Sequence, residues 1–393
     1  MLNTKFSPWP SFTEEEANAA RDVILSNKVN YWTGQETRSF EKEFAAWSGT
    51  EYAVALANGT VALDLALKAL GIGAGDEVIV TSRTFLASVS SIVNAGAFPV
   101  FADVDLDSQN FTADTIRSVL TPRTKALICV HLAGWPCDMD PIMALANEHG
   151  LKVIEDCAQA HGAYYKGRPV GSIGHIGAWS FCQDKIMTTG GEGGMVTTND
   201  RQLWADMWAY KDHGKSWEAV YEREHAPGFR WLHESFGTNW RMLEVQAVIG
   251  RIQLRRMQDW HRARLDNALA IWTAARLLPA LRVPDLPDDE VHAAYKCYVF
   301  VRPQCLKPDW SRDRILNEII ARGVPAFSGS CSEVYLEKAF DNTDWRPAQR
   351  LANARELGET SMMFMVHPTL TGEEIGLTCR VISDVVQQAS LPC

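Results

Sequence analysis

Residues 178–199 read AWSFCQDKIMTTGGEGGMVTTN, and this stretch gives the clearest indication of how the chain folds. Residues 177–182 alternate small, aromatic and apolar side chains as a strand does, and residues 194–198 form a second short run typical of a strand. Lys185 therefore lies in the connection between two predicted strands. The glycines at 190, 191, 193 and 194 permit positive φ angles and close approach of the backbone, so a large flat group could lie beside this lysine.

Asp156 is predicted to lie close to this connection. The pattern KVIEDC at 152–157 is typical of a buried strand that ends in an acidic pair, and open α/β sheets bind ligands at the carboxyl ends of their strands. A lone loop lysine is usually solvated, but an aspartate in such a position is costly unless it meets a positive partner. A lysine that can bond to an aldehyde, an aspartate for a ring nitrogen and a glycine-rich loop are the parts that a pyridoxal phosphate site needs.

Strand and helix patterns alternate through the first half of the chain. Strands are predicted at 52–56, 77–81, 99–104, 126–132 and 152–157, and helices at 61–70, 86–95, 113–120 and 141–148. This alternation predicts an α/β fold with a mixed, mainly parallel sheet that is flanked by helices on both faces.

The chain is predicted to have two domains. A cap-plus-acid pattern predicts a helix at 14–25, and a long helix is predicted to end at about residue 275. Residues 279–289 are rich in proline and acid, which is typical of a connection, and a strand at 295–301 with helices at 311–322, 352–360 and 372–388 follows. We therefore expect an N-terminal arm and large α/β domain at 1–275 and a smaller C-terminal α+β domain at 276–393.

Composition limits the partners and the compartment. The 38 basic and 48 acidic residues give a net charge of −10, which argues against nucleic acid or an acidic membrane surface as a partner. The nine cysteines are scattered and never spaced C-x-x-C, so neither a structural metal site nor a disulfide framework is expected. With no signal peptide or membrane span recognised in the sequence, we expect a cytoplasmic protein.

Several motifs resemble one family. EDCAQAHGA at 155–163, SFxxxK at 180–185 and GEGGMVTTND at 191–200 are similar to motifs of the DegT/DnrJ/EryC1/StrS family of sugar aminotransferases. NGTxAL at 58–63 and GxNxRM at 237–242 also match, so that the resemblance covers most of residues 30–250. It implies a fold-type I, aspartate aminotransferase-like structure with pyridoxal 5′-phosphate as cofactor.

The resemblance also implies residue roles. Lys185 would bind the cofactor covalently and move the proton, while Asp156 would pair with the ring nitrogen. The other cofactor contacts that it implies are Gly59, Thr60 and Ser180 at the phosphate, Phe85 against the ring, Gln159 at the phenolic oxygen, and Asn239 at the phosphate of a neighbouring subunit. If Asn239 acts in this way, the protein is a homodimer with shared active sites. Tyr31 and Trp32 are candidate substrate contacts, and Arg230 and Arg241 are candidates for binding the anionic ends of the substrates.

The activity implied is transfer of an amino group from glutamate, which leaves as 2-oxoglutarate, to a keto sugar that is most often linked to a nucleotide. Amino sugars for surface polysaccharides, such as lipopolysaccharide O-antigen, or for antibiotics are the products expected of the family. A keto-cyclitol or a sugar without a nucleotide stays open as the acceptor. A sugar 3-dehydratase is disfavoured, because those relatives carry histidine where this chain has Lys185, and a non-catalytic regulator is disfavoured because lysine, aspartate, glutamine and glycines occur together.

Overall fold

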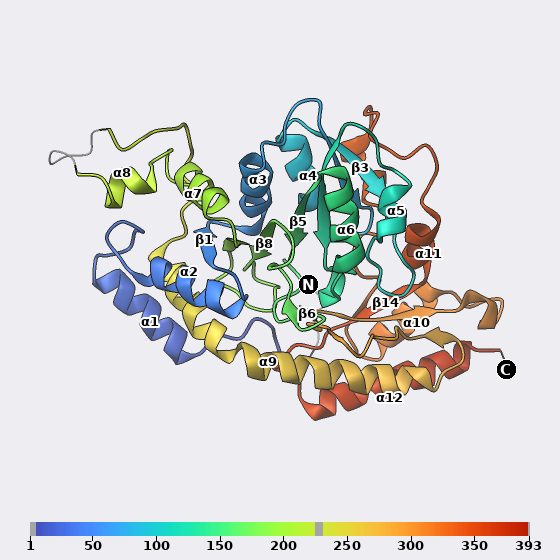
Figure 1. Ribbon diagram of the computed structural model, residues 1–393. Helices are drawn as coiled ribbons and strands as arrows, with labels where there is room; N and C mark the ends of the chain where they lie inside the picture. Colours follow the sequence, from blue (N-terminus) through green and yellow to red (C-terminus); the bar gives the residue numbers. More distant parts are fainter. Residues whose placement is uncertain (1–4, 225–230, 392–393) are drawn as a thin grey trace.

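The computed structural model describes residues 5–224 and 231–391. Figure 1 shows an α/β body with a long helix, α9, running along one side of it toward the C-terminal elements. The α/β fold expected from the alternating patterns is confirmed.

The central sheet has seven strands in the order β1-β9-β8-β5-β4-β2-β3. Four pairs of neighbours (β2 with β3, β2 with β4, β4 with β5, and β5 with β8) are parallel, and only β9 runs antiparallel to its two neighbours. The strands are β1 (Tyr52–Leu56), β2 (Glu77–Thr81), β3 (Phe98–Ala102), β4 (Thr124–Val130), β5 (Lys152–Asp156), β8 (Ile176–Ser180) and β9 (Gly194–Thr198).

Helices cover both faces of this sheet because its buried strands are apolar on both sides. Val78 and Val80 of β2 pack in the cluster under α3, α4 and α7, whereas Ile79 between them packs under α5 and α6. Helices α2 and α9 cover the second face beside β1, β8 and β9. These helices are α2 (Glu36–Trp47), α3 (Gly59–Ala69), α4 (Ala87–Asn94), α5 (Ala113–Arg117), α6 (Met139–His149), α7 (Arg201–Tyr210) and α9 (Glu244–Arg276).

A second sheet, antiparallel and four-stranded, forms the C-terminal part in the order β10-β12-β14-β13. Its core includes the last turns of α9, where Ile271 and Trp272 are buried. The elements are β10 (Leu281–Arg282), β12 (Cys297–Val301), β13 (Ala326–Phe327), β14 (Ser361–Phe364), α10 (Arg312–Ala321), α11 (Ala352–Thr360) and α12 (Gly372–Ala389). The domain division after residue 275 stays a prediction, although α9 ends at Arg276.

Three further short strands and two helices complete the chain. Strands β6 (Tyr164–Tyr165), β7 (Arg168–Pro169) and β11 (Glu290–Val291) form a small sheet in the order β11-β6-β7. Helix α1 (Glu14–Leu25) precedes the large sheet, and α8 (Trp217–Tyr221) lies in the irregular stretch before α9.

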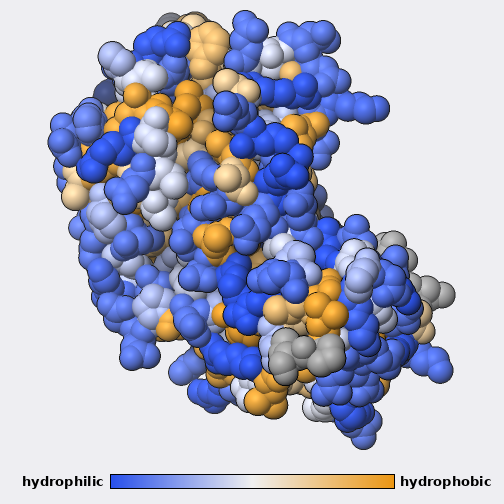
Figure 2. All heavy atoms as spheres, turned by 90° about the vertical axis from the view of Figure 1, so that its right-hand side faces the viewer, coloured by the Kyte–Doolittle hydropathy of each residue, from blue (hydrophilic) through white to orange (hydrophobic). Residues whose placement is uncertain are grey.

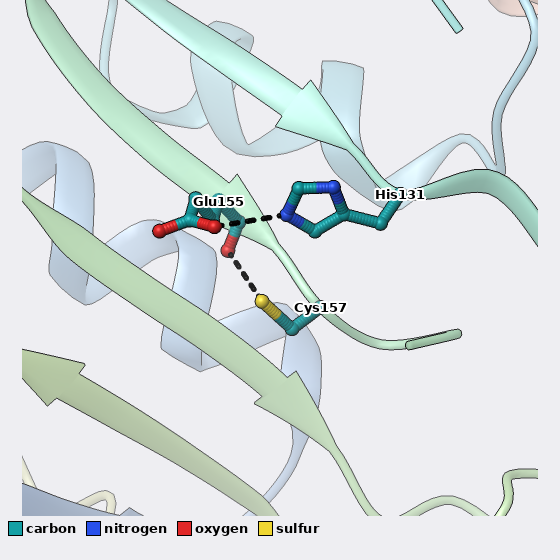
Figure 3. Close-up of side chains that lie close together, drawn as sticks. All are labelled: His131, Glu155 and Cys157. Carbon is teal, nitrogen blue, oxygen red and sulfur yellow. Dashed lines mark hydrogen bonds and ion pairs between the residues drawn. The ribbon is translucent and has the colours of Figure 1, made fainter. Parts of the chain in front are cut away.

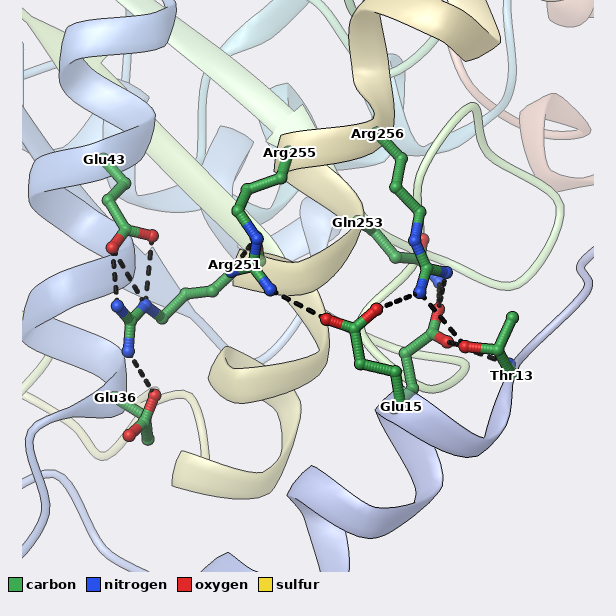
Figure 4. A network of polar contacts seen from close by, with 9 residues as sticks. Thr13, Glu15, Glu36, Glu43, Arg251, Gln253, Arg255 and Arg256 are labelled. Atoms are coloured by element: carbon green, nitrogen blue, oxygen red, sulfur yellow. Dashed lines mark hydrogen bonds and ion pairs between the residues drawn. The ribbon is translucent and has the colours of Figure 1, made fainter.

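Charged side chains join α9 to both N-terminal helices (Figure 4). Arg251 forms a bidentate contact with Glu43 of α2 and donates to Glu36 at 2.6 Å, while Arg256 donates to Glu16 of α1 at 2.8 Å. Gln253 then links α1 to the loop that carries Lys185, because its Oε1 accepts the Thr188 N–H at 2.8 Å and its amide donates to Glu16. This network holds the loop after Lys185 against α9.

The face of the molecule in Figure 2 is mostly hydrophilic, with hydrophobic residues in scattered small groups. Among the described residues, no helix combines the length and apolar character that crossing a membrane requires.

Candidate active site

A cavity of about 780 Å³ opens at the carboxyl ends of β5 and β8. It is lined by seven of the residues that the sequence singled out, which are Gly59, Thr60, Phe85, Asp156, Gln159, Ser180 and Lys185. The structure therefore brings together residues from four separate parts of the chain. Lys185 and Asp156 face one common space.

Lys185 lies in the loop between β8 and β9, as its spacing predicted, and 16% of its side chain is exposed. Its Nζ lies 3.7 Å from Oδ1 of Asp184 and 5.3 Å from the centre of the Tyr295 ring. Its backbone oxygen accepts a hydrogen bond from the Trp9 indole at 2.8 Å, so the N-terminal arm also holds this loop. The lysine is thus fixed at its backbone while its amine stays accessible from the cavity.

Asp156 ends β5 and is buried, with 6% of its surface exposed. Its Oδ2 accepts the Ser88 hydroxyl at 2.8 Å, and its Oδ1 accepts the Ala158 N–H at 3.1 Å. Burial raises the pKa of Asp156, and these two hydrogen bonds and the charge of Lys185 oppose that rise without cancelling it. A cationic group in the cavity would complete the stabilisation of this carboxylate.

Gln159 offers a hydrogen-bond donor to the cavity, and Phe85 offers a flat aromatic surface. The Gln159 Oε1 accepts the Ala133 N–H at 2.8 Å, so its remaining amide hydrogens can be donated to a group in the cavity. Phe85 is 70% exposed although it is a large apolar ring, and it lies on the cavity wall. Such an exposed ring beside a site can cover the face of an aromatic ligand.

The N-terminus of α3 closes one end of the cavity. Asn58 caps this helix by accepting the Val61 N–H at 3.0 Å. A side chain at Gly59 would meet Cβ of Ser180 at 2.5 Å, so only glycine lets the helix end approach the end of β8 this closely. The first N–H groups of a helix and a nearby hydroxyl form a suitable cradle for a phosphate.

These features fit pyridoxal 5′-phosphate. Lys185 would bind its aldehyde, the buried Asp156 its protonated ring nitrogen, and the α3 N-terminus with Ser180 its phosphate. The cavity volume is also ample for an aromatic ring and a substrate together.

The structure does not bring the remaining predicted residues to this cavity. Tyr31 is only 1% exposed, and its hydroxyl accepts the Trp208 indole N–H at 2.9 Å, so it has no free surface for a substrate. Trp32 is half-buried, with Nζ of Lys215 4.1 Å from its ring centre. Arg241 forms an ion pair with Asp212 at 2.6 Å.

Two more predicted residues need separate mention. Asn239 is exposed and pairs through its backbone with Asp212. It lies outside the active-site cavity of its own subunit. Arg230 lies outside the residues that the structure describes.

Sequence reasoning missed cavity residues that come from distant elements. Ser88 is on α4, and Tyr295, Lys296 and Tyr298 precede or lie in β12 of the C-terminal sheet. The spacing of Thr84 and Ser88 could have indicated a shared side of a turn, since their hydroxyls are 2.9 Å apart. No local pattern could have placed Lys296 in the same cavity as Lys185.

His131, Glu155 and Cys157 form a buried group at the carboxyl ends of β4 and β5 (Figure 3). Their possible ligand atoms lie within 4.8 Å of one another, but Glu155 already accepts from His131 at 3.0 Å and from the N–H groups of Gly171, Ile173 and Gly174. Burial alone would raise the pKa of Glu155, yet these donors outweigh it and the pKa is lowered. The group is a hydrogen-bonded anchor that holds β5 and the loop before β8 in place.

Comparison with known proteins agrees with this site. The DegT/DnrJ/EryC1/StrS aminotransferase family model matches residues 10–385. The spore coat polysaccharide biosynthesis protein SpsC of Bacillus subtilis is 34% identical over 97% of this chain and 96% of its own. The UDP-N-acetyl-3-dehydro-alpha-D-glucosamine 3-aminotransferase of Acidithiobacillus ferrooxidans is 36% identical over 92% of this chain and 93% of its own.

A solved structure is also similar over the full fold. The aminotransferase from Psychrobacter cryohalolentis superposes with a TM-score of 0.97 at 66% identity, covering 98% of this chain and 99% of that one. The expectations of a sugar aminotransferase and of its cofactor are both confirmed. The chain belongs to the DegT/DnrJ/EryC1/StrS aminotransferase family and uses pyridoxal 5′-phosphate.

Proposed function

We propose that this protein transfers the amino group of glutamate to the carbonyl carbon of a keto sugar carried on a nucleotide. The observation that carries the proposal is the single cavity that Lys185 and Asp156 share, since it holds the reactive amine and the ring-nitrogen partner in one space. The name of the Acidithiobacillus ferrooxidans relative, an aminotransferase for a UDP-linked keto sugar, supports a nucleotide-linked acceptor.

The residues have distinct tasks in this reaction. Lys185 would hold the cofactor through its Nζ, and the same amine would serve as the base that moves the proton of the substrate carbon. Asp156 would keep the ring nitrogen protonated. Its burial and its hydrogen bond with Ser88 hold the carboxylate in place for this pairing. Pyridoxal 5′-phosphate supplies, when bound, the electron-withdrawing ring that stabilises negative charge on the substrate carbon.

The surrounding residues orient the cofactor. Phe85 covers one ring face, Gln159 donates to the phenolic oxygen, and Ser180, Gly59 and Thr60 hold the phosphate. We also propose a cytoplasmic homodimer in which the exposed Asn239 reaches the phosphate in the partner subunit. Its exposure and its position outside the cavity of its own subunit support this arrangement.

The product is proposed to serve a surface polysaccharide such as an O-antigen. The polysaccharide role in the name of the Bacillus subtilis relative supports this.

The absorption spectrum of the purified protein tests the proposal. A band near the visible edge should shift when glutamate is added, and the correct keto sugar nucleotide should restore it. Lys185→Ala should lose the band because the covalent link is gone, whereas Lys125→Ala, at an exposed position, should keep it. A band retained in Lys185→Ala would show that another lysine binds the cofactor, and a wild-type protein that cannot be loaded with cofactor would refute the activity.

A further inference from the structure

Lys296 is a second lysine on the wall of the active-site cavity. It comes from the C-terminal part, directly before β12, and is half-buried. Its Nζ lies 4.7 Å from the centre of the Tyr295 ring, and Nζ of Lys185 lies 5.3 Å from the centre of the same ring. Both amines therefore lie close to the same phenol ring on the cavity wall.

Among the described residues, Lys296 has neither an ion pair within 4.0 Å nor a side-chain hydrogen bond. Asp184 is the acid that faces it, but Asp184 is already paired with Lys185 at 3.7 Å and accepts the Tyr295 hydroxyl. The pKa of Lys296 is lowered to about 8, chiefly by burial and also by the charges of Arg264 and Lys185, while the charge of Asp184 opposes this shift. A half-buried ammonium in this setting is stabilised by an added anion.

The other groups around Lys296 do not supply that anion. Arg264 of α9 is buried beside it, and its Nε and Nη2 have no hydrogen-bond partner among the described residues. Burial lowers the pKa of His367 to about 3, and the charges of Arg264 and Lys296 lower it as well, so this histidine is neutral. The region is electropositive around one unpaired amine that reaches the cavity.

The two substrates of the proposed reaction differ in where they carry negative charge. In an amino acid donor, the α-carboxylate is attached directly to the carbon that loses its proton. In a keto sugar nucleotide, the sugar ring separates the diphosphate from the reacting carbon. A cation that shares the Tyr295 ring with Lys185 therefore matches the donor carboxylate better than the acceptor diphosphate.

We propose that Lys296 binds the α-carboxylate of the amino donor. This subsite deepens the proposed function and rests on it. Arg241, a candidate from the sequence, forms an ion pair with Asp212 and does not line the cavity, so it does not occupy the place of Lys296. Lys296 turns the donor so that its reacting carbon faces the amine of Lys185.

The test compares Lys296→Met with Lys296→Arg, which keeps the charge, and with the exposed control Lys125→Met. The ligand is 2-methylglutamate, which has the amine and both carboxylates of glutamate but no hydrogen on the α-carbon, so it binds to the cofactor-loaded protein without proton transfer. Its dissociation constant is read from the change in absorption. Loss of a charge-assisted hydrogen bond should raise this constant about tenfold or more in Lys296→Met.

We expect Lys296→Arg to recover most of the affinity and Lys125→Met to match the wild type. The KM of the keto sugar nucleotide should change less than about threefold in Lys296→Met, because its charge lies elsewhere. An unchanged dissociation constant in a folded, cofactor-loaded Lys296→Met would overturn the inference, as would a large rise in the acceptor KM alone. In both cases the wild-type response to glutamate would still support transamination, whereas a wild-type protein that responds to no amino donor would refute the proposed function together with the subsite.

Discussion

The substitution Ser88→Ala tests how the carboxylate of Asp156 is held in the active site. The Oγ of Ser88 lies 2.8 Å from Oδ2 of Asp156, and because its hydrogen goes to that carboxylate, Thr84 must donate to the Ser88 oxygen, 2.9 Å away. Ser88→Ala removes a buried hydrogen bond to a charged group, which contributes about 1.5–3 kcal/mol. This energy would serve to hold the Asp156 carboxylate against the protonated ring nitrogen of the cofactor. The kcat should therefore fall about ten- to hundredfold, since about 1.4 kcal/mol corresponds to a factor of ten.

The direction of the pH effect follows from the same contact. Burial already raises the pKa of Asp156, and the Ser88 hydroxyl opposes this rise. Without the hydroxyl the pKa rises further, the carboxylate is protonated at higher pH, and the acidic limb of the pH profile of kcat/KM moves to higher pH.

The assay measures transamination of glutamate across the pH range, with cofactor loading checked by absorption. Ser90→Ala is the matched control, because Ser90 lies on the same helix but bonds the Ala87 backbone oxygen and not Asp156. A folded Ser88→Ala protein with the kcat and acidic limb of the wild type would refute the role assigned to this hydroxyl.

Two further substitutions test the phosphate cradle and the anchor behind the site. Gly59→Ala places a Cβ 2.5 Å from Cβ of Ser180, so α3 must shift and cofactor affinity should fall about tenfold or more, as measured by titration of the apoprotein. Gly372→Ala, at the start of α12 with open space around it, should leave the affinity unchanged, and equal affinities in both variants would contradict the cradle. Glu155→Gln should lower the free energy of unfolding by about 3 kcal/mol at neutral pH, because a buried charged partner of His131 is lost. Since the pKa of Glu155 is lowered by folding, its contribution is present above the ordinary value of about 4.3 and disappears as the pH falls through the lower folded value. Denaturant unfolding should therefore show a wild-type advantage that shrinks in acid, and an advantage that grows in acid would contradict this reasoning.

Elements with local signals could be predicted closely. The helix at 14–25 and the strands at 52–56 and 77–81 have the same bounds in the structure, because a capping box and short runs of apolar residues act within a few positions. The strand expected at 295–301 starts only at Cys297, since the N–H of Tyr295 bonds the Ala133 backbone oxygen instead of a strand. That partner is far away in the sequence.

One helix and the direction of one strand were not predicted. No helix was predicted at residues 36–47, although Phe40 and Phe44 of α2 are buried one turn apart. The antiparallel direction of β9 has no signature in its own residues, because alternation is the same in both directions.

The sequence by itself determined the chemistry of this protein. Lys185, Asp156 and the glycine-rich loop are the parts that a pyridoxal phosphate site needs, and the motifs around them resemble those of one family, which implies the reaction class before any coordinates. Only the tertiary structure decided which charges stay available to a substrate. Arg241 meets Asp212 and is neutralised, while Lys296 reaches the cavity without a partner among the described residues, because ion pairs form between side chains that folding brings together from distant parts of the chain.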